Sequence, residues 1–269
     1  MGPREIRRPH GADSERRQRV VSGGARVPGA RDHRDRRRAG GVRVSLEGVA
    51  TRVGPEAVVV TAERELIVLS SAVVGGGFAR ARSVLNVHVP KNFLCADAAG
   101  AVADAARRLG VPAPWVGLLT GAWTERAEMA TAEADDVRAL VVATVGLSNP
   151  SAAGLSPRAE PLPATINTIA VLDADPEPAA LVNLVMTLTE VKTDVLRTAG
   201  VRCDDGRPAT GTSSDAIVVA ATARGPRCRY GGPLTALGWA AASATRVALE
   251  TGVRRWIADH HAVQGGASA

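Results

Sequence analysis

The chain has 269 residues, of which 45% are hydrophobic, so it is long enough to bury a substantial core in one domain or two. Only 3% of the residues are aromatic, and that core must therefore be built from Val, Ala and Leu. The net charge of +6 would suit a nucleic-acid-binding protein, but the first 43 residues alone contain 13 of the 31 arginines with five acidic residues. The rest of the chain holds 20 basic and 22 acidic residues and predicts no basic surface for DNA or RNA.

The first predicted element is an arginine-rich tail at residues 1–42. It has few hydrophobic residues, scattered Gly and Pro, and no helical or alternating period, which predicts disorder. The apolar part of "RVVSGG" is too short for a secretory signal, and no run of about 18 apolar residues could span a membrane. Cys95, Cys203 and Cys228 are widely spaced, which argues against a disulfide framework or a zinc site. Together these features predict a cytoplasmic protein.

From about residue 42 the sequence changes to consecutive strands. β-branched runs separated by Gly, Pro or charged residues predict strands at 42–51, 56–62, 64–74 and 83–89. The alanine-rich stretch "LCADAAGAVADAARRLG" predicts a helix that ends at Gly110.

The second half of the chain alternates strands and helices. Strands are predicted at 115–120 and 137–146 on either side of "ERAEMATAEADD", whose type the sequence does not decide, and at 165–173 and 215–222. Helices are predicted at 176–200 and 231–250, the latter with Pro233 near its start. Several strands followed by a β-α-β-α pattern predict an α+β fold, with a mixed β-sheet and helices packed mainly on one face. We expect one domain after the tail and a frayed C-terminus at 259–269.

Four stretches of this region occur in a particular order: "LSSAVVGGGFARARSVLNVHVP", "VATVGLSNP", "TINTIAVLD" with "TLTEVKTDVL", and "TGTSSDAIVVA". Together with "GGPLTALGWA" they resemble the adenosylcobinamide amidohydrolase family. The resemblance implies an amidohydrolase domain at 43–258 that hydrolyses the amide between aminopropanol and the corrin side chain. The product would be adenosylcobyric acid, for cobalamin salvage. A non-catalytic corrinoid-binding module is the alternative function.

Amide hydrolysis needs a nucleophile, a group that moves protons, and donors for the developing oxyanion. The stretch "TGTSSD" places a glycine between hydroxyl residues before a strand, which allows backbone N–H groups to form an oxyanion-binding nest. Thr212 and Asp215 are therefore catalytic candidates, and Thr210, Gly211 and Ser213 are candidate substrate contacts. Two alternatives stay open: an ordinary turn in which Asp215 bonds the local backbone, and self-cleavage after Gly211 that would free Thr212.

The chain contains only two lysines, Lys91 and Lys192. Helical spacing places Lys192 on the apolar stripe of its helix, where a lysine must pair, extend to solvent or lose its charge. Arginine is bulkier and always charged, so it could not replace a compact or titratable amine there. We expect Asp215 or another loop carboxylate as the partner. Glu190 completes the predicted catalytic set, although it points to the opposite side of the helix.

Further substrate contacts are predicted on the strands. Asn86 and His88 share one face of the 83–89 strand, with Lys91 just beyond it, and Asn167 lies on the 165–173 strand. The alternatives are a histidine with ordinary strand partners and an exposed turn lysine.

The remaining predictions concern the corrin, metals and assembly. Trp115 and Trp123 are candidates for packing on the corrin, although a core position is the alternative for both. The sequence shows no metal-ligand spacing, leaves a divalent metal open, and does not determine the oligomeric state. Nucleic acid and membrane are not expected partners.

Deletion of residues 1–42 is expected to leave folding and turnover of adenosylcobinamide nearly unchanged, because this segment has too little apolar surface to join the core. Thermal unfolding and turnover of the full and shortened chains provide the test. A large loss of either property on deletion would show that the tail is part of the domain.

Overall fold

The computed structural model describes residues 45–91, 93, 97–159 and 165–265, and side chains as far as residue 260. All of these residues belong to one compact unit, Val42–Ala269. The predicted tail at 1–42 and Cys95 lie outside the described residues.

A mixed sheet of eight strands forms the centre of this unit, in the order β4-β3-β2-β11-β8-β6-β5, with β1 paired to β2. Its strands are β1 (Val49–Val53), β2 (Ala57–Ser70), β3 (Gly77–His88), β4 (Trp115–Thr120), β5 (Glu128–Ala134), β6 (Val137–Val145), β8 (Ile166–Asp173) and β11 (Ala216–Ala221). The central strand β11 is parallel to β8 and antiparallel to β2, while β3 and β4 are parallel. The predicted mixed sheet is confirmed.

Two short pairs of strands lie outside the sheet and hold its loops. β7 (Pro150–Ser151) pairs with β10 (Gly211–Thr212), and β9 (Asp175–Pro176) pairs with β12 (Arg227–Cys228). The segment whose type the sequence left undecided forms a short 3₁₀ helix, η2 (Thr124–Arg126), followed by β5.

The two halves of the sheet face each other across an apolar layer. Val60 of β2 and Val84 of β3 belong to the same buried cluster as Val142 of β6, Val171 of β8 and Val218 of β11. Alternation along each strand places every second residue in this layer and leaves the others for the outer faces, which the helices cover.

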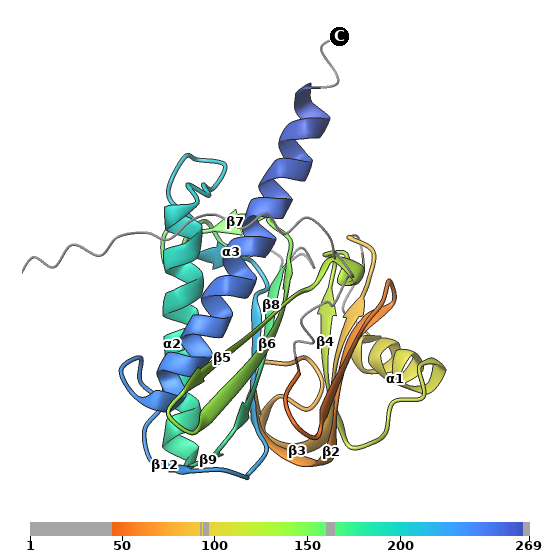
Figure 1. Cartoon of the computed structure of the whole chain (residues 1–269). Coiled ribbons are helices and arrows are strands. Elements are labelled where there is room, and N and C mark those ends of the chain that lie inside the picture. Colours follow the sequence, from red (N-terminus) through yellow and green to blue (C-terminus); the bar gives the residue numbers. More distant parts are fainter. Residues whose placement is uncertain (1–44, 92, 94–96, 160–164, 266–269) are drawn as a thin grey trace, which may run out of the picture. The chain divides into compact units, whose positions relative to one another are not determined.

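Helices cover the outer faces of the sheet (Figure 1). The two long helices, α2 (Pro178–Thr198) and α3 (Ala236–Gly265), pack together against β6, β8 and β11, while α1 (Ala98–Arg108) covers the other half at β3 and β4. The prediction of an α+β fold with helices mainly on one face is therefore confirmed, and residues 259–265, predicted to fray, are helical.

The helix boundaries follow local chemistry. α2 begins at Pro178, whose fixed φ suits the first helical position, and ends before Gly200, which has a φ of +71°. Asp97 caps α1 by accepting a hydrogen bond from the Gly100 N–H at 2.9 Å. The resulting register of α2 decides which of its side chains reach the sheet.

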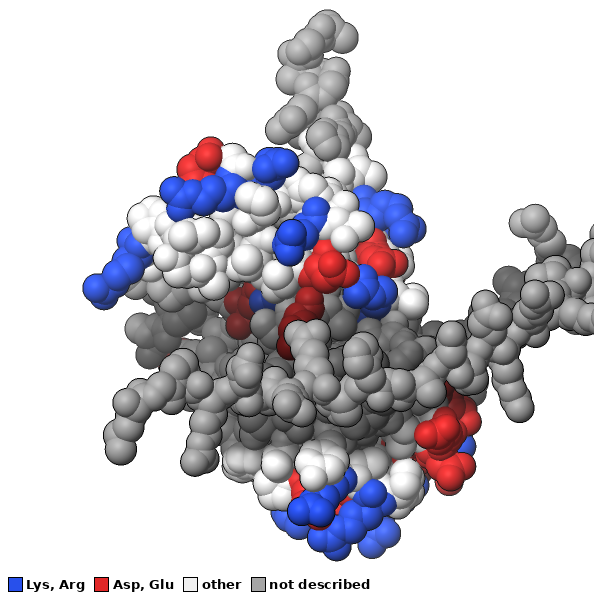
Figure 2. All heavy atoms as spheres, turned by 90° about the vertical axis from the view of Figure 1, so that its left-hand side faces the viewer, with Lys and Arg blue, Asp and Glu red and all other residues white. Residues whose placement is uncertain are grey.

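The described surface has no single electrostatic character on the side shown in Figure 2, where Lys and Arg side chains are interspersed with Asp and Glu. Among the helices of the described residues, none has the length and apolar character needed to cross a membrane.

Candidate functional site

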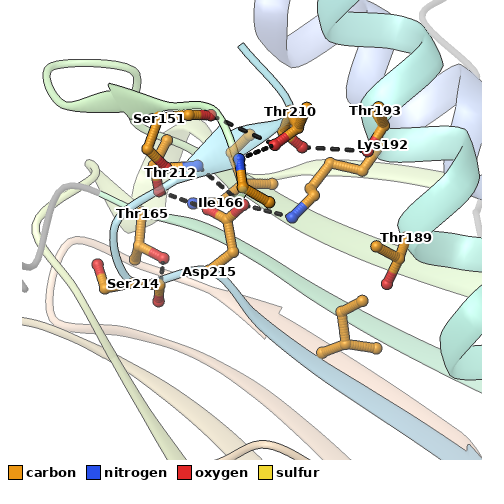
Figure 3. A network of polar contacts seen from close by, with 12 residues as sticks. Ser151, Thr165, Ile166, Thr189, Lys192, Thr193, Thr210, Thr212, Ser214 and Asp215 are labelled. Atoms are coloured by element: carbon orange, nitrogen blue, oxygen red, sulfur yellow. Dashed lines mark hydrogen bonds and ion pairs between the residues drawn. The ribbon is translucent and has the colours of Figure 1, made fainter. Parts of the chain in front are cut away.

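Asp215 is the centre of a compact polar cluster in the loop between β10 and β11 (Figure 3). Its Oδ1 accepts the Ile166 N–H at 3.0 Å and the Thr212 hydroxyl. Its Oδ2 accepts the Thr212 N–H at 3.0 Å and an ion-paired hydrogen bond from Lys192 Nζ. Each carboxylate oxygen therefore has two donors, which fixes the orientation of the group.

Lys192 reaches this carboxylate from α2 (Figure 3). Its side chain is 11% exposed and that of Asp215 is 10% exposed, so the pair is largely removed from water. The neighbouring stripe residues Leu188 and Val195 are buried, as helical spacing predicts. The predicted contact between Lys192 and Asp215 is confirmed.

Gly211 allows the backbone to pass close to this ion pair. A Cβ atom at Gly211 would lie 2.5 Å from Asp215 Oδ2 and 2.9 Å from Lys192 Nζ, closer than real Cβ contacts. Position 211 therefore needs a residue without a side chain because of this close approach.

The loop around Gly211 is anchored on both sides. The Thr210 N–H donates to the Ser151 carbonyl at 2.9 Å, and the Thr193 hydroxyl of α2 donates to the Thr210 carbonyl at 3.1 Å. The Thr210 hydroxyl in turn accepts the Ala153 N–H at 2.9 Å. Thr210 is thus part of the scaffold that holds the loop next to α2.

A chain of buried side chains connects the loop to the sheet. The Asn86 amide donates to the Thr144 hydroxyl at 2.9 Å and accepts from the Asn167 amide at 2.8 Å. The Thr165 hydroxyl has two acceptors within range: the Asn167 side-chain oxygen at 3.0 Å and the Ser214 carbonyl at 2.7 Å. The substrate-contact role of Asn86 and Asn167 stays a prediction, and both amides here support the residue before Asp215.

The sequence did not identify Thr144 and Thr165 as members of this network of buried side chains. Isolated threonines in strands are too common to single out. The usable signal was the presence of Asn86 and Asn167 in otherwise apolar strands, because buried amides need partners.

The other predicted residues lie outside the Asp215 cluster. Glu190 is exposed and lines a different cleft, with Trp239 and Arg246. His88 donates through Nδ1 to the Ala122 carbonyl at 2.9 Å, and Lys91 is exposed. Ser213 adjoins the cluster and accepts a hydrogen bond from the Asn149 amide.

Cysteine chemistry has little support among the described residues. Burial, with the nearby Asp175 carboxylate adding to it, raises the pKa of the Cys228 thiol above its usual range, so the nucleophilic thiolate is disfavoured at neutral pH. Cys203 is buried. Within the described ranges, no group of three or more His, Cys, Asp or Glu side chains is placed to hold a metal ion.

Replacing Lys192 by methionine is expected to lower the free energy of unfolding by on the order of 3 kcal/mol, because the substitution leaves a buried carboxylate without its cation. The double variant Lys192→Met/Asp215→Asn should recover part of this loss, since it removes both charges. Urea unfolding of the single and double variants is the measurement.

Lys91→Met is the matched control, because it removes the other lysine of the chain from an exposed position. It should change the free energy of unfolding by no more than about 0.5 kcal/mol. A Lys192→Met variant as stable as this control would contradict a net stabilising role for the ion pair.

The part of the chain that forms this fold also matches known proteins. The family model described as adenosylcobinamide amidohydrolase matches residues 44–261. An adenosylcobinamide amidohydrolase of Halobacterium salinarum is 36% identical over 145 residues, which is 51% of this chain and 56% of that protein. The matched stretch thus spans about half the length of each protein.

Two solved structures are similar at low identity. A protein of Pyrococcus horikoshii OT3 has a TM-score of 0.42 and 13% identity, covering 76% of this chain and 82% of that one. A β-aminopeptidase of a Burkholderia species has a TM-score of 0.40 and 16% identity, covering 77% and 80%. The family match over residues 44–261 has much greater weight, and by it the chain belongs to the adenosylcobinamide amidohydrolase family.

Proposed function

We propose that this protein hydrolyses the amide between aminopropanol and the corrin propionate side chain of adenosylcobinamide. The products are adenosylcobyric acid and 1-amino-2-propanol, and the reaction returns the corrin to cobalamin salvage. Family membership supports this class of reaction. The observation that carries the proposal is the Thr212 hydroxyl, which donates to an Asp215 carboxylate fixed by Lys192.

In the first step, Thr212 Oγ attacks the carbonyl carbon of the amide while Asp215 accepts the hydroxyl proton. The bond to the aminopropanol nitrogen then breaks. Asp215 passes its proton to that nitrogen, so the amine leaves neutral and the corrin remains as an ester on Thr212. The hydrogen bond from the Thr212 hydroxyl to Asp215 Oδ1 supports this proton transfer.

In the second step, water attacks the ester. Asp215 accepts a proton from the water and returns one to Thr212 Oγ as the ester bond breaks, which releases adenosylcobyric acid. Lys192 acts as a positioning residue, because its ammonium holds Asp215 Oδ2 and balances its charge while Oδ1 faces the hydroxyl.

Incubation of the purified protein with adenosylcobinamide should give adenosylcobyric acid and free aminopropanol, with the adenosyl ligand intact. Mass spectrometry of the reaction, with and without added divalent metal, is the measurement. Tight corrinoid binding without product under both conditions would support the binding-module alternative instead. Measuring the intact mass of the protein tests the self-cleavage alternative, because cleavage would split the chain after Gly211.

Asp215→Asn and Thr212→Val are each expected to reduce turnover by about 10²- to 10⁴-fold, because each removes one end of the proton transfer. Thr212→Ser retains the hydroxyl and should retain a measurable part of the activity. Thr189→Val is the control, since Thr189 is on α2 but its hydroxyl donates to Val185 of its own helix at 2.8 Å. Near-normal turnover in Asp215→Asn would contradict the catalytic role of Asp215 and support the alternative that this loop is an ordinary structural turn.

A further inference from the structure

A cleft lies between the Gly121–Arg126 segment and the C-terminal part of α3. It is a shallow cleft with a cavity volume of about 100 Å³, and Trp123 and Trp256 are among its lining residues. The chain has four tryptophans, and two of them line this one cleft. Such concentration is notable in a protein whose core is almost entirely aliphatic.

Each tryptophan is supported by a histidine ring. Trp123 stacks on His88 with ring centroids 4.9 Å apart, and Trp256 stacks on His260 with centroids 3.7 Å apart. Trp123 is nevertheless 59% exposed, so much of its surface is available to a ligand. Trp256 packs partly against the core, so Trp123 is the tryptophan that offers a flat apolar surface at the cleft.

Ion pairs hold the two walls together. Arg126 pairs with Asp259, and Arg255 pairs with Glu128 at 2.6 Å. Arg255 also donates to the Arg126 carbonyl at 3.3 Å. Both arginines are thus engaged in fixing the cleft.

Lys91 is the lining cation that these pairs do not use. Its Nζ lies 3.4 Å from the Ser148 hydroxyl, and it forms no ion pair with any residue of the described ranges. An exposed ammonium beside a hydroxyl can donate to the carbonyl oxygen of an amide side chain on a bound ligand.

Hydrogen bonds connect Gly146, another lining residue of the cleft, to the Asp215 cluster. The Gly146 N–H donates to the Thr165 carbonyl at 3.1 Å, and the Thr165 hydroxyl donates to the carbonyl of Ser214, next to Asp215. In the same segment, Pro150 is the strand partner of Thr212. A ligand in the cleft therefore lies against the segment that also supports the proposed nucleophile.

We propose that the mouth of this cleft, at Trp123, binds the corrin macrocycle of the substrate, a broad ring with apolar faces and an amide-bearing rim. The exposed Trp123 packs against the ring face, and Lys91 donates to a rim amide. This inference rests on the proposed function, since it assigns the binding site for the same substrate.

The test compares two exposed tryptophans in a common Asp215→Asn background, in which turnover is suppressed and cobinamide binding can be measured by equilibrium dialysis. Trp123→Ala should raise the Kd for cobinamide at least about 10-fold, because it removes an aromatic anchor. Trp239→Ala is the matched control. Trp239 is 50% exposed and lines the separate cleft with Glu190, so its loss should change Kd less than about twofold.

The same tryptophan substitutions in the otherwise native chain separate this inference from the proposed function. Hydrolysis with an unchanged KM in Trp123→Ala would overturn the cleft assignment and leave the function standing. Cobinamide binding that depends on Trp123, without any hydrolysis, would overturn the function and leave the cleft assignment standing. Equal Kd values for Trp123→Ala and Trp239→Ala would also overturn the cleft assignment.

Discussion

A buried ammonium and a buried carboxylate, Lys192 and Asp215, meet where α2 faces the β10–β11 loop, and the surrounding backbone is arranged to keep both in place. Removing such charges from water costs several kcal/mol for each ion, and attraction offsets this cost only when the remaining hydrogen-bonding positions are filled. The Ile166 and Thr212 N–H groups and the Thr212 hydroxyl fill those of the carboxylate here. The same contacts that stabilise the charges also orient the hydroxyl proposed to attack the substrate.

The buried asparagines extend this organisation into the sheet. Asn86 and Asn167 join β3 to β8, and Thr165 continues the chain to the loop, so the position of Asp215 depends on strands far from it in sequence. Satisfied buried networks of this kind are rigid, because each broken bond leaves a polar group without water. A rigid loop at Asp215 and an exposed Trp123 would suit the proposed division between chemistry and binding.

Much of the fold could be predicted from local pattern, since the strands and helices have clear periods and breaks. The charged residue Glu63 suggested a break between two strands, yet β2 continues through it and the charged Arg64 and Glu65, with a shift in register between Thr61 and Leu66. These residues are exposed, so a charged segment costs the strand little. The segment at 125–136, whose type the sequence did not decide, contains β5. It forms a strand because it pairs with β6, and this pairing cannot be read from the local sequence.

For the site, the sequence by itself indicated which polar groups come together. A lysine on an apolar helical stripe requires a partner, and a hydroxyl-glycine-aspartate loop before a strand can supply one; both follow from spacing along a single segment. Only the tertiary structure decided that Asp215, and no other loop carboxylate, is that partner, that Glu190 faces another cleft, and that Trp123 and Trp256 line one cleft. These contacts join segments far apart in the chain, and their approach is set by how α2 and α3 pack on the sheet.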